Sequence, residues 1–268
     1  MGALDHPTAV LAELFDGGAQ VYDRCWAPVL HRRTRELARL VPDAETPRVV
    51  LDVATGAGTL LPELQRLGGP AGVVLGLDRS LGMLRQAPGH ASLVQADAMR
   101  LPVADARADV VVQAFVLFLL PDAPAAVAEA ARVLRPGGWL LAATWSEQRT
   151  SPAEQLVLDE IDRAGAPPAP ALPRSDRWTS SPDRLRDLLV PAGFTDIETI
   201  GRPLGARFDA ESVLALRTGA AASGWRFRQL SAGHQADVLR RCRRGLASLA
   251  PEDFADDSEV LLTRARRR

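Results

Sequence analysis

The sequence predicts an α/β fold built on a doubly wound, mostly parallel sheet of seven strands with helical cap elements. Apolar runs alternate with segments of helical spacing between residues 48 and 145, and such β-α alternation is typical of parallel strands joined by right-handed crossovers. One apolar run ends at Asp52 and passes through Gly56 and Gly58 into a helical pattern, which indicates a strand, a tight turn and a helix. A second run ends at Asp78, where the next parallel strand would bring its carboxylate to the same crevice.

The composition favours small-molecule chemistry. The chain has 268 residues, of which 47% are hydrophobic and 24% charged, as in globular proteins with a large core. A net charge of −1 provides no positive field for nucleic acid or anionic membranes, so we expect neither as a partner. The longest apolar run, 110–120, is shorter than the ~20 residues of a membrane span. Because no signal peptide is evident at the N-terminus, we expect a cytoplasmic protein.

Residues 1–46 are predicted to form an N-terminal helical cover. Apolar residues recur at helical spacing and are interrupted at Gly17 and Gly18; a second segment ends at Pro28, and a third covers 29–40. Helices that precede the first strand of an open sheet can fold back over its crevice. Cys25 and Cys242 show no metal-like spacing, so no metal site is expected.

Residues 47–145 are predicted to be the cofactor-binding core. The expected strands end at Asp52 and Asp78 and cover 91–96, 108–114 and 139–145, and the expected helices cover 58–67, a short segment capped by Ser80, and 123–134. Asp97 follows the third strand. Three carboxylates are therefore expected at the ends of three strands.

The remaining chain is predicted to carry two insertions. Residues 146–181 form a lid insertion, with a helix over 153–164 and a proline-rich covering loop over 164–173. In the C-terminal half, 182–268, a helix through Leu189 and a strand over 194–200 precede a helical insert, 209–249, and a closing strand over 259–263. We expect one domain throughout.

Four stretches, 50–58, 76–84, 95–102 and 131–138, resemble the class I S-adenosylmethionine-dependent methyltransferases. The resemblance is to their small-molecule branch, similar to quinone-biosynthesis methyltransferases. It implies a Rossmann-like methyltransferase fold, an enzyme, and S-adenosyl-L-methionine as cofactor. Ala54 stands where the family usually has Gly.

The resemblance also implies the cofactor site. Asp78 would accept the ribose hydroxyls, Asp97 the adenine amine, and Asp52 would lie near the amino group. Arg79 and Met83 would pack on the adenosine. The implied cofactor-binding residues are Tyr22, Asp52, Ala54, Gly56, Gly58, Asp78, Arg79, Met83, Asp97, Ala98, Gln113 and Ala114.

The expected acceptor is small and largely apolar, a natural product or quinone-like molecule. Candidate residues for its pocket are the aromatic side chains of Trp26, Phe115, Phe118, Trp145 and Trp178. No His lies in a motif that marks a general base, so the catalytic residues stay unassigned. Of the four His residues, His31 lies nearest the expected lid, and a position on the surface of a helix is favoured over a role as a base.

Three alternatives remain open. The first is a non-methylating enzyme, a cyclase or decarboxylase, that reuses the same cofactor fold. A second is an NAD-dependent dehydrogenase, although the glycine-rich turn lacks the third glycine of that fingerprint and Asp97 would have no role. The third is a non-catalytic scaffold, which three carboxylates at strand ends disfavour.

Overall fold

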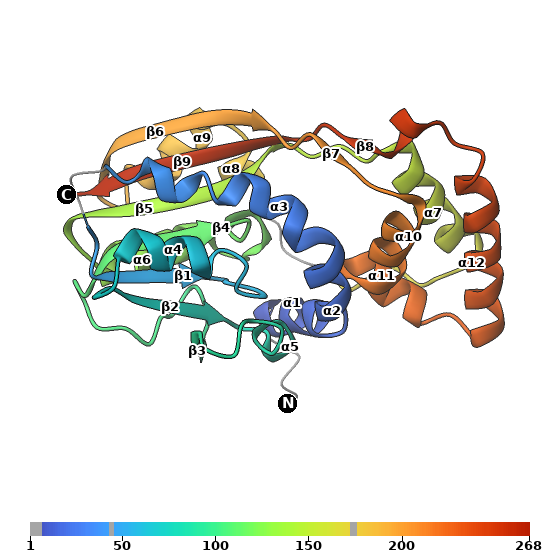
Figure 1. Cartoon of the computed structure of the whole chain (residues 1–268), viewed down its shortest axis with the longest axis horizontal. Coiled ribbons are helices and arrows are strands. Elements are labelled where there is room, and N and C mark those ends of the chain that lie inside the picture. Colours follow the sequence, from blue (N-terminus) through green and yellow to red (C-terminus); the bar gives the residue numbers. More distant parts are fainter. Residues whose placement is uncertain (1–6, 43–45, 172–175) are drawn as a thin grey trace.

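The computed structural model of the chain describes residues 7–42, 46–171 and 176–268. Its centre is a seven-stranded sheet with the order β3-β2-β1-β4-β5-β9-β6 (Figure 1). The strands are β1 (Val49–Val53), β2 (Val73–Asp78), β3 (Ser92–Gln95), β4 (Ala108–Ala114), β5 (Leu134–Glu147), β6 (Phe194–Pro203) and β9 (Glu259–Arg267). The first five run parallel, and β9 is antiparallel to both β5 and β6. The predicted doubly wound, mostly parallel sheet is confirmed.

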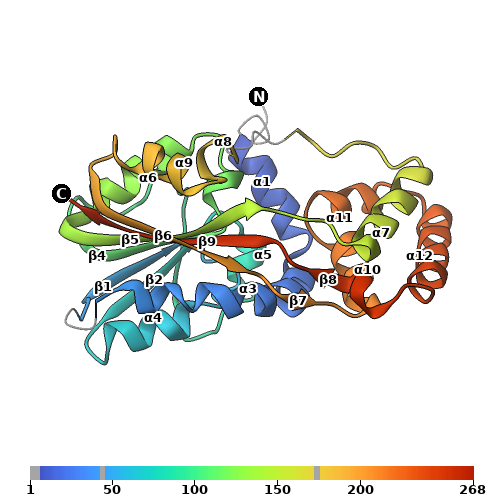
Figure 2. The same cartoon turned by 90° about the horizontal axis from the view of Figure 1, so that it is seen from above.

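Helices cover both faces of the sheet because alternate strand residues point to opposite sides. Val50 packs in a cluster with Leu64 of α4, whereas its neighbour Leu51 packs in another with Val127 of α6. In Figure 2 the sheet is seen nearly edge-on between these layers. One face carries α3 (Ala27–Thr34) and α4 (Leu61–Gly68), and the other carries α6 (Ala123–Val133), α8 (Asp176–Thr179) and α9 (Pro182–Leu189).

The N-terminal helices reach the carboxyl end of the sheet. They are α1 (Pro7–Asp16), α2 (Ala19–Val21), a π-helical turn (Tyr22–Trp26) and α3. Asp16 fixes α1 to the short helix α5 (Leu81–Leu84), since its carboxylate accepts from the Gly82 amide at 2.7 Å and from the Ser80 hydroxyl. The expectation that the second segment ends at Pro28 is wrong. Pro28 lies in the first turn of α3, where its missing N–H is tolerated.

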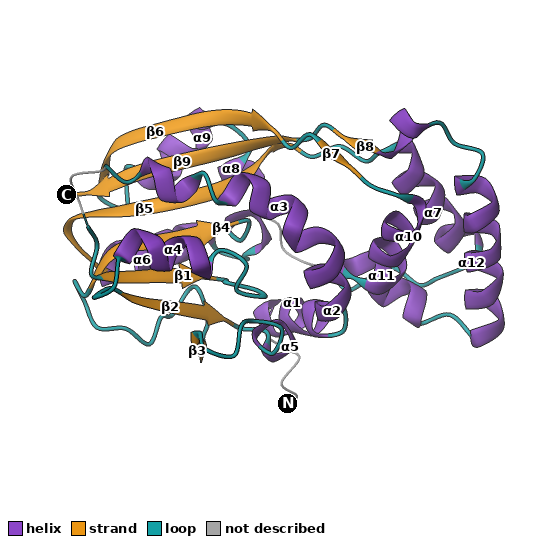
Figure 3. Cartoon of the chain, viewed as in Figure 1, coloured by secondary structure: helices purple, strands orange, loops and turns teal. Residues whose placement is uncertain are grey.

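A second group of helices forms a lobe beside the sheet (Figure 3). It contains α7 (Pro152–Arg163), α10 (Ala210–Gly219), α11 (Ala221–Arg228) and α12 (Ala232–Leu246). Ile161, Val213, Phe227 and Val238 are buried in its own apolar core. A ribbon of β7 (Ala206–Arg207) and β8 (Ala255–Asp256) links it to the sheet. Helix α7 of the predicted lid insertion and the helices of the predicted helical insert are thus packed into one lobe, whereas α8, at the end of the predicted lid insertion, lies against the sheet.

The predicted proline-rich loop is irregular over its described part. Residues 165–171 contain no helix or strand, and positions 172 and 173 lie outside the described residues. Arg226 of α11 donates to the carbonyl oxygens of Ala166 at 3.1 Å and Pro167 at 2.9 Å. These bonds hold the start of the loop against the lobe.

Several predicted boundaries needed correction, since β9 runs to Arg267 rather than 263 and β6 to Pro203 rather than 200. The helix expected from residue 58 begins at Leu61, because Gly58 has a φ of +70° that no α-helix accommodates. β5 begins at Leu134 rather than Trp139, since Leu134 already pairs with Ala108 of β4. Among the described residues, no helix is long and apolar enough to span a membrane.

Candidate active site

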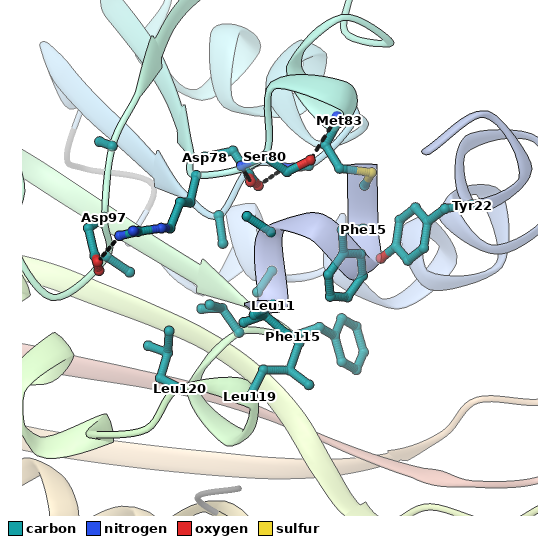
Figure 4. A pocket seen from close by; sticks show the side chains of 18 residues that line it. Leu11, Phe15, Tyr22, Asp78, Ser80, Met83, Asp97, Phe115, Leu119 and Leu120 are labelled. Carbon is teal, nitrogen blue, oxygen red and sulfur yellow. Dashed lines mark hydrogen bonds and ion pairs between the residues drawn. The ribbon is translucent and has the colours of Figure 1, made fainter. Parts of the chain in front are cut away.

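A cavity lies at the carboxyl ends of β1, β2 and β4, where the sequence predicted the site (Figure 4). We call it the acidic cavity, because Asp78 and Asp97 line it. In Figure 4, Asp97 and Tyr22 lie on opposite sides of the view with Asp78 between them. Its lining includes nine of the twelve predicted cofactor-binding residues, namely Tyr22, Ala54, Gly56, Asp78, Arg79, Met83, Asp97, Ala98 and Ala114.

The carboxylate of Asp78 is held rigidly at the end of β2. It accepts from the Gly56 amide at 2.8 Å with one oxygen and from the Ser80 amide at 2.8 Å with the other. Burial raises the pKa of Asp78, and these amide hydrogen bonds oppose that rise. The bonds join the turn after β1 to the end of β2, so the cavity wall is built before any ligand arrives.

Asp97 is fixed by two donors on the other side of the cavity. Its carboxylate accepts from the Arg79 guanidinium at 2.5 Å and from the Met99 amide at 2.9 Å. Side-chain exposure is 18% for Asp97 and 36% for Arg79, so the pair is partly shielded from solvent. Arg79 therefore positions a carboxylate as well as lining the cavity.

The turn between β1 and α4 brings bare backbone to the cavity. Gly56 has a φ of +57°, and a Cβ there would approach the Met83 methyl group at 3.1 Å. Ala54 adopts a φ of +62° although it carries a side chain, so the substitution for the family's glycine leaves the turn conformation in place. The predicted strand, turn and helix arrangement is thereby observed in detail.

Asp52 faces a smaller adjoining cavity, which we call the Asp52 cavity. Ala54, Gly56, Tyr22, Ala114 and Phe115 line both this cavity and the acidic one. Asp52 is only 2% exposed and accepts from the Thr55 hydroxyl at 2.7 Å.

Burial raises the pKa of Asp52 to about 7; the Thr55 hydrogen bond lowers it and the charge of Asp78 raises it. The group therefore titrates near neutrality in the unliganded protein.

His31 also lines the Asp52 cavity. Its Nε2 lies 3.3 Å from a carboxylate oxygen of Glu63, and its side chain is 25% exposed. The sequence favoured a helix-surface position for His31. The structure instead places it on the wall of the Asp52 cavity and beside Glu63 of α4, a tertiary contact that no local pattern indicated.

The cover contributes residues that the sequence placed on a helix without assigning them to the site. Leu11 and Phe15 of α1 line the acidic cavity, and the rings of Phe15 and Tyr22 meet edge-on at 5.9 Å. Burial, reinforced by the charge of Asp78, raises the pKa of Tyr22, so its phenol stays protonated at neutral pH. The N-terminal helices thus provide part of the lining of the acidic cavity.

A larger cavity adjoins the acidic cavity on the side of the lobe, with a volume of about 250 Å³ against about 100 Å³. We call it the aromatic cavity. Four of the five candidate acceptor residues line it, Trp26, Phe115, Phe118 and Trp145. Phe115 and Trp145 lie 4.7 Å apart between ring centroids, and Trp26 stacks on Trp145 at 6.3 Å. The two cavities share Leu11, Phe15, Tyr22, Phe115 and Leu119.

Comparisons with known proteins agree with this geometry. A family model described as a methyltransferase domain matches residues 51–142. The ubiquinone/menaquinone biosynthesis C-methyltransferase UbiE of Pseudomonas putida is 30% identical over 207 residues, covering 69% of this chain and 80% of the relative. The chain belongs to the class I S-adenosylmethionine-dependent methyltransferases.

Solved structures show that this methyltransferase shares its fold with enzymes of diverse chemistry. An S-adenosylmethionine-dependent methyltransferase from Thermotoga maritima superimposes with a TM-score of 0.54 at 16% identity, covering 96% of this chain and 99% of that one. The [4+2]-cyclase SpnF gives a TM-score of 0.51 at 20% identity, covering 88% and 80%. Both matches concern the fold alone. The cofactor of the family, and of this methyltransferase, is S-adenosyl-L-methionine.

Three predicted site residues of the methyltransferase lie outside these cavities. Gly58 is packed by protein, since a Cβ there would meet Leu61 at 2.9 Å and Ala87 at 3.0 Å. Gln113 is not among the residues that line the cavities; its side-chain amide donates to the Ala126 carbonyl of α6 at 3.2 Å, and the resemblance implies a role for its backbone carbonyl alone.

Trp178 is the third of these residues. It lies on α8, packed against the core cluster that contains α6 and α9, with Arg177 5.4 Å from its ring centroid. Because α8 covers the sheet face carrying α6, the structure does not bring Trp178 to the aromatic cavity.

Proposed function

We propose that the methyltransferase transfers a methyl group to a small, largely apolar acceptor bound in the aromatic cavity, with the cofactor bound in the acidic and Asp52 cavities. The main support for this proposal is that the acidic and aromatic cavities adjoin. Both are lined by Leu11, Phe15, Tyr22, Phe115 and Leu119. A methyl donor and an acceptor require such adjacent sites, because the reacting atoms must be held in line and close together.

The residues of the acidic cavity fit S-adenosylmethionine. Its ribose hydroxyls and adenine amine need acceptors, and the fixed carboxylates of Asp78 and Asp97 supply them. Gly56 leaves the turn open to close approach, and Met83 offers an apolar surface to the nucleoside. When bound, the cofactor supplies an electrophilic methyl on its sulfonium sulfur.

Asp52 and Ala114 are the proposed partners of the amino-acid end of the cofactor. Asp52 has a pKa of about 7, so a cationic ammonium beside it would favour its charged form. Ala114 lines both cofactor cavities at the end of β4. Within the single predicted domain, residues 47–145 thus act as the cofactor-binding core.

The aromatic cavity favours a flat apolar acceptor. Trp26, Phe118 and Trp145 present ring surfaces, and aromatic stacking stabilises planar ligands beyond the burial of their area. No His is found among the described residues that line this cavity, so an acceptor whose nucleophile is already available at neutral pH fits best. A quinol that reacts through its electron-rich ring carbon, or a phenol acidic enough to be ionised at neutral pH, has this character, whereas the hydroxyl of an ordinary phenol has a pKa of about 10.

The test combines cofactor binding with an acceptor screen. Calorimetry with S-adenosylhomocysteine should show saturable binding to the full chain. Incubation with S-adenosylmethionine and a panel of naphthols, quinols and phenols, followed by mass spectrometry, should reveal a methylated product together with S-adenosylhomocysteine. Cofactor binding with conversion of an acceptor but no S-adenosylhomocysteine would instead indicate a non-methylating reaction on this fold.

A further inference from the structure

A single guanidinium stands among the aromatic and aliphatic residues of the aromatic cavity. Arg217 belongs to α10 of the lobe and lines this cavity but not the acidic one. Its Nη2 donates to a carboxylate oxygen of Glu154 on α7. Glu154 is itself buried, with 4% of its side chain exposed, whereas 28% of the Arg217 side chain is exposed. The cation is therefore the accessible member of the pair.

Glu154 divides its carboxylate between this arginine and the cap of α7. Its second carboxylate oxygen accepts from the Ser151 amide at 3.0 Å as part of the cap of α7. Within the described part of the chain, no acceptor is found for the buried Nε of Arg217. Guanidinium hydrogens left without acceptors beside apolar surface are unfavourable.

Few other polar groups face the same space. Gln148 and Tyr22 line the cavity, whereas most of its surface comes from residues such as Leu14, Leu30 and Phe118. A wholly apolar ligand would thus cover the arginine without replacing its hydrogen bonds to water. A ligand with an oxygen acceptor at this end would replace them.

We propose that Arg217 is a specificity-determining residue that binds a carbonyl or carboxylate oxygen of the acceptor. This inference rests on the proposed function and narrows its substrate class to apolar ring systems that carry such an oxygen remote from the methylated atom. The acceptor oxygen is placed away from the methylated atom because Arg217 belongs to the lobe. Tyr22 and Phe115, by contrast, lie at the wall shared with the acidic cavity, where the methyl group would be transferred. Glu154 positions the guanidinium and partly neutralises it.

If the Arg217–Glu154 ion pair only holds α7 and α10 together, replacing Arg217 should not change which ligands bind. Arg226, which also forms an ion pair within the lobe, supplies the matched control. Arg226 joins α11 to α7 through Asp162 at 2.6 Å and lines neither cavity. Replacing Arg226 by Met removes a lobe ion pair without touching the acceptor site. Glu154→Gln removes the neutralising charge and leaves one acceptor oxygen where Glu154 has two, one for Arg217 and one for the Ser151 amide.

The experiment is equilibrium dialysis of naphthalene, 2-acetylnaphthalene and 2-naphthoate against the full chain saturated with S-adenosylhomocysteine. In the unmodified protein we expect the two oxygen-bearing probes to bind about tenfold more tightly than naphthalene. Arg217→Met should abolish this preference while naphthalene binding changes by less than about twofold. Arg226→Met should preserve it. Glu154→Gln should tighten 2-naphthoate selectively, because only this probe is charged.

The outcomes separate the two proposals. If the three probes bind equally and Arg217→Met changes nothing, the role of Arg217 is overturned while the aromatic cavity stands. If none of them binds although S-adenosylhomocysteine does, the proposed acceptor site itself is overturned. If Arg217→Met fails to fold, Glu154→Gln decides, because a structural ion pair predicts no selective gain for 2-naphthoate.

Discussion

Replacing Asp52 by Asn should stabilise the unliganded protein above pH 7 and remove a large part of its pH dependence between pH 5 and 8. Asp52 is 2% exposed, and burial is the main reason why its pKa rises from the ordinary 3.8 to about 7. Its hydrogen bond from Thr55 lowers the pKa and the nearby Asp78 carboxylate raises it. Asn has a similar shape, can still accept from Thr55, and does not ionise.

Proton linkage decides whether stability rises or falls with pH. The folded state binds the Asp52 proton more tightly than the unfolded state does. Ionisation of Asp52 therefore costs no unfolding free energy below about pH 4, where the group is protonated in both states, and costs the full amount above pH 7. At 1.36 kcal/mol for each pH unit, the interval from 3.8 to about 7 corresponds to at most roughly 4 kcal/mol. Roughly 3 kcal/mol of this should develop between pH 5 and 8.

Urea unfolding followed by tryptophan fluorescence at pH 5 and pH 8 measures this difference. The unmodified protein should lose more stability over the interval than Asp52→Asn. Asp187→Asn is a matched control, since Asp187 is exposed on α9. Asp78 also has a raised pKa and will contribute pH dependence in both proteins. Identical pH dependence in the unmodified protein and Asp52→Asn would refute the reasoning.

Three further substitutions test the site. Asp78→Asn should weaken S-adenosylhomocysteine binding about 100-fold in calorimetry, because two charge-assisted hydrogen bonds to ribose would be weakened; an affinity equal to that of the Asp187→Asn control would exclude the role. Asp16→Ala should raise the KM for S-adenosylmethionine about tenfold and speed hydrogen exchange of the α1 amides, because the bonds of Asp16 to Ser80 and Gly82 restrain α1. Unchanged amide exchange would contradict this. Ala54→Gly should raise the free energy of unfolding by about 0.5 to 1 kcal/mol, since its φ of +62° favours glycine. A lower melting temperature would count against strain at Ala54.

The cofactor side of the site was predictable because its signals are local. Asp52 and Asp78 each end an apolar run, and parallel strands bring such ends to one edge. Gly56 marks the turn by its own conformational freedom. These features lie within a few residues of the strands that position them, so the sequence carries them directly.

The acceptor side depends on contacts between distant segments. Trp178 and Trp145 are equally apolar in the sequence, yet α8 packs on one sheet face while the end of β5 reaches the aromatic cavity. Arg217 carries no local signal among the 32 Lys and Arg residues of the chain. Its position follows only from the packing of α10 on α7, and these helices are separated in the sequence by α8, α9, β6 and β7.

Chain segments leave the sheet for the lobe after β5 and β6 and return to it before α8 and before β9. The turns that line the acidic cavity follow β1, β2, β3 and β4 instead. The lobe therefore contributes one side of the aromatic cavity and, among the described residues, none of the lining of the acidic cavity. Under the proposed function, exchanging the lobe between relatives would alter the acceptor site and leave the turns of the cofactor site in place.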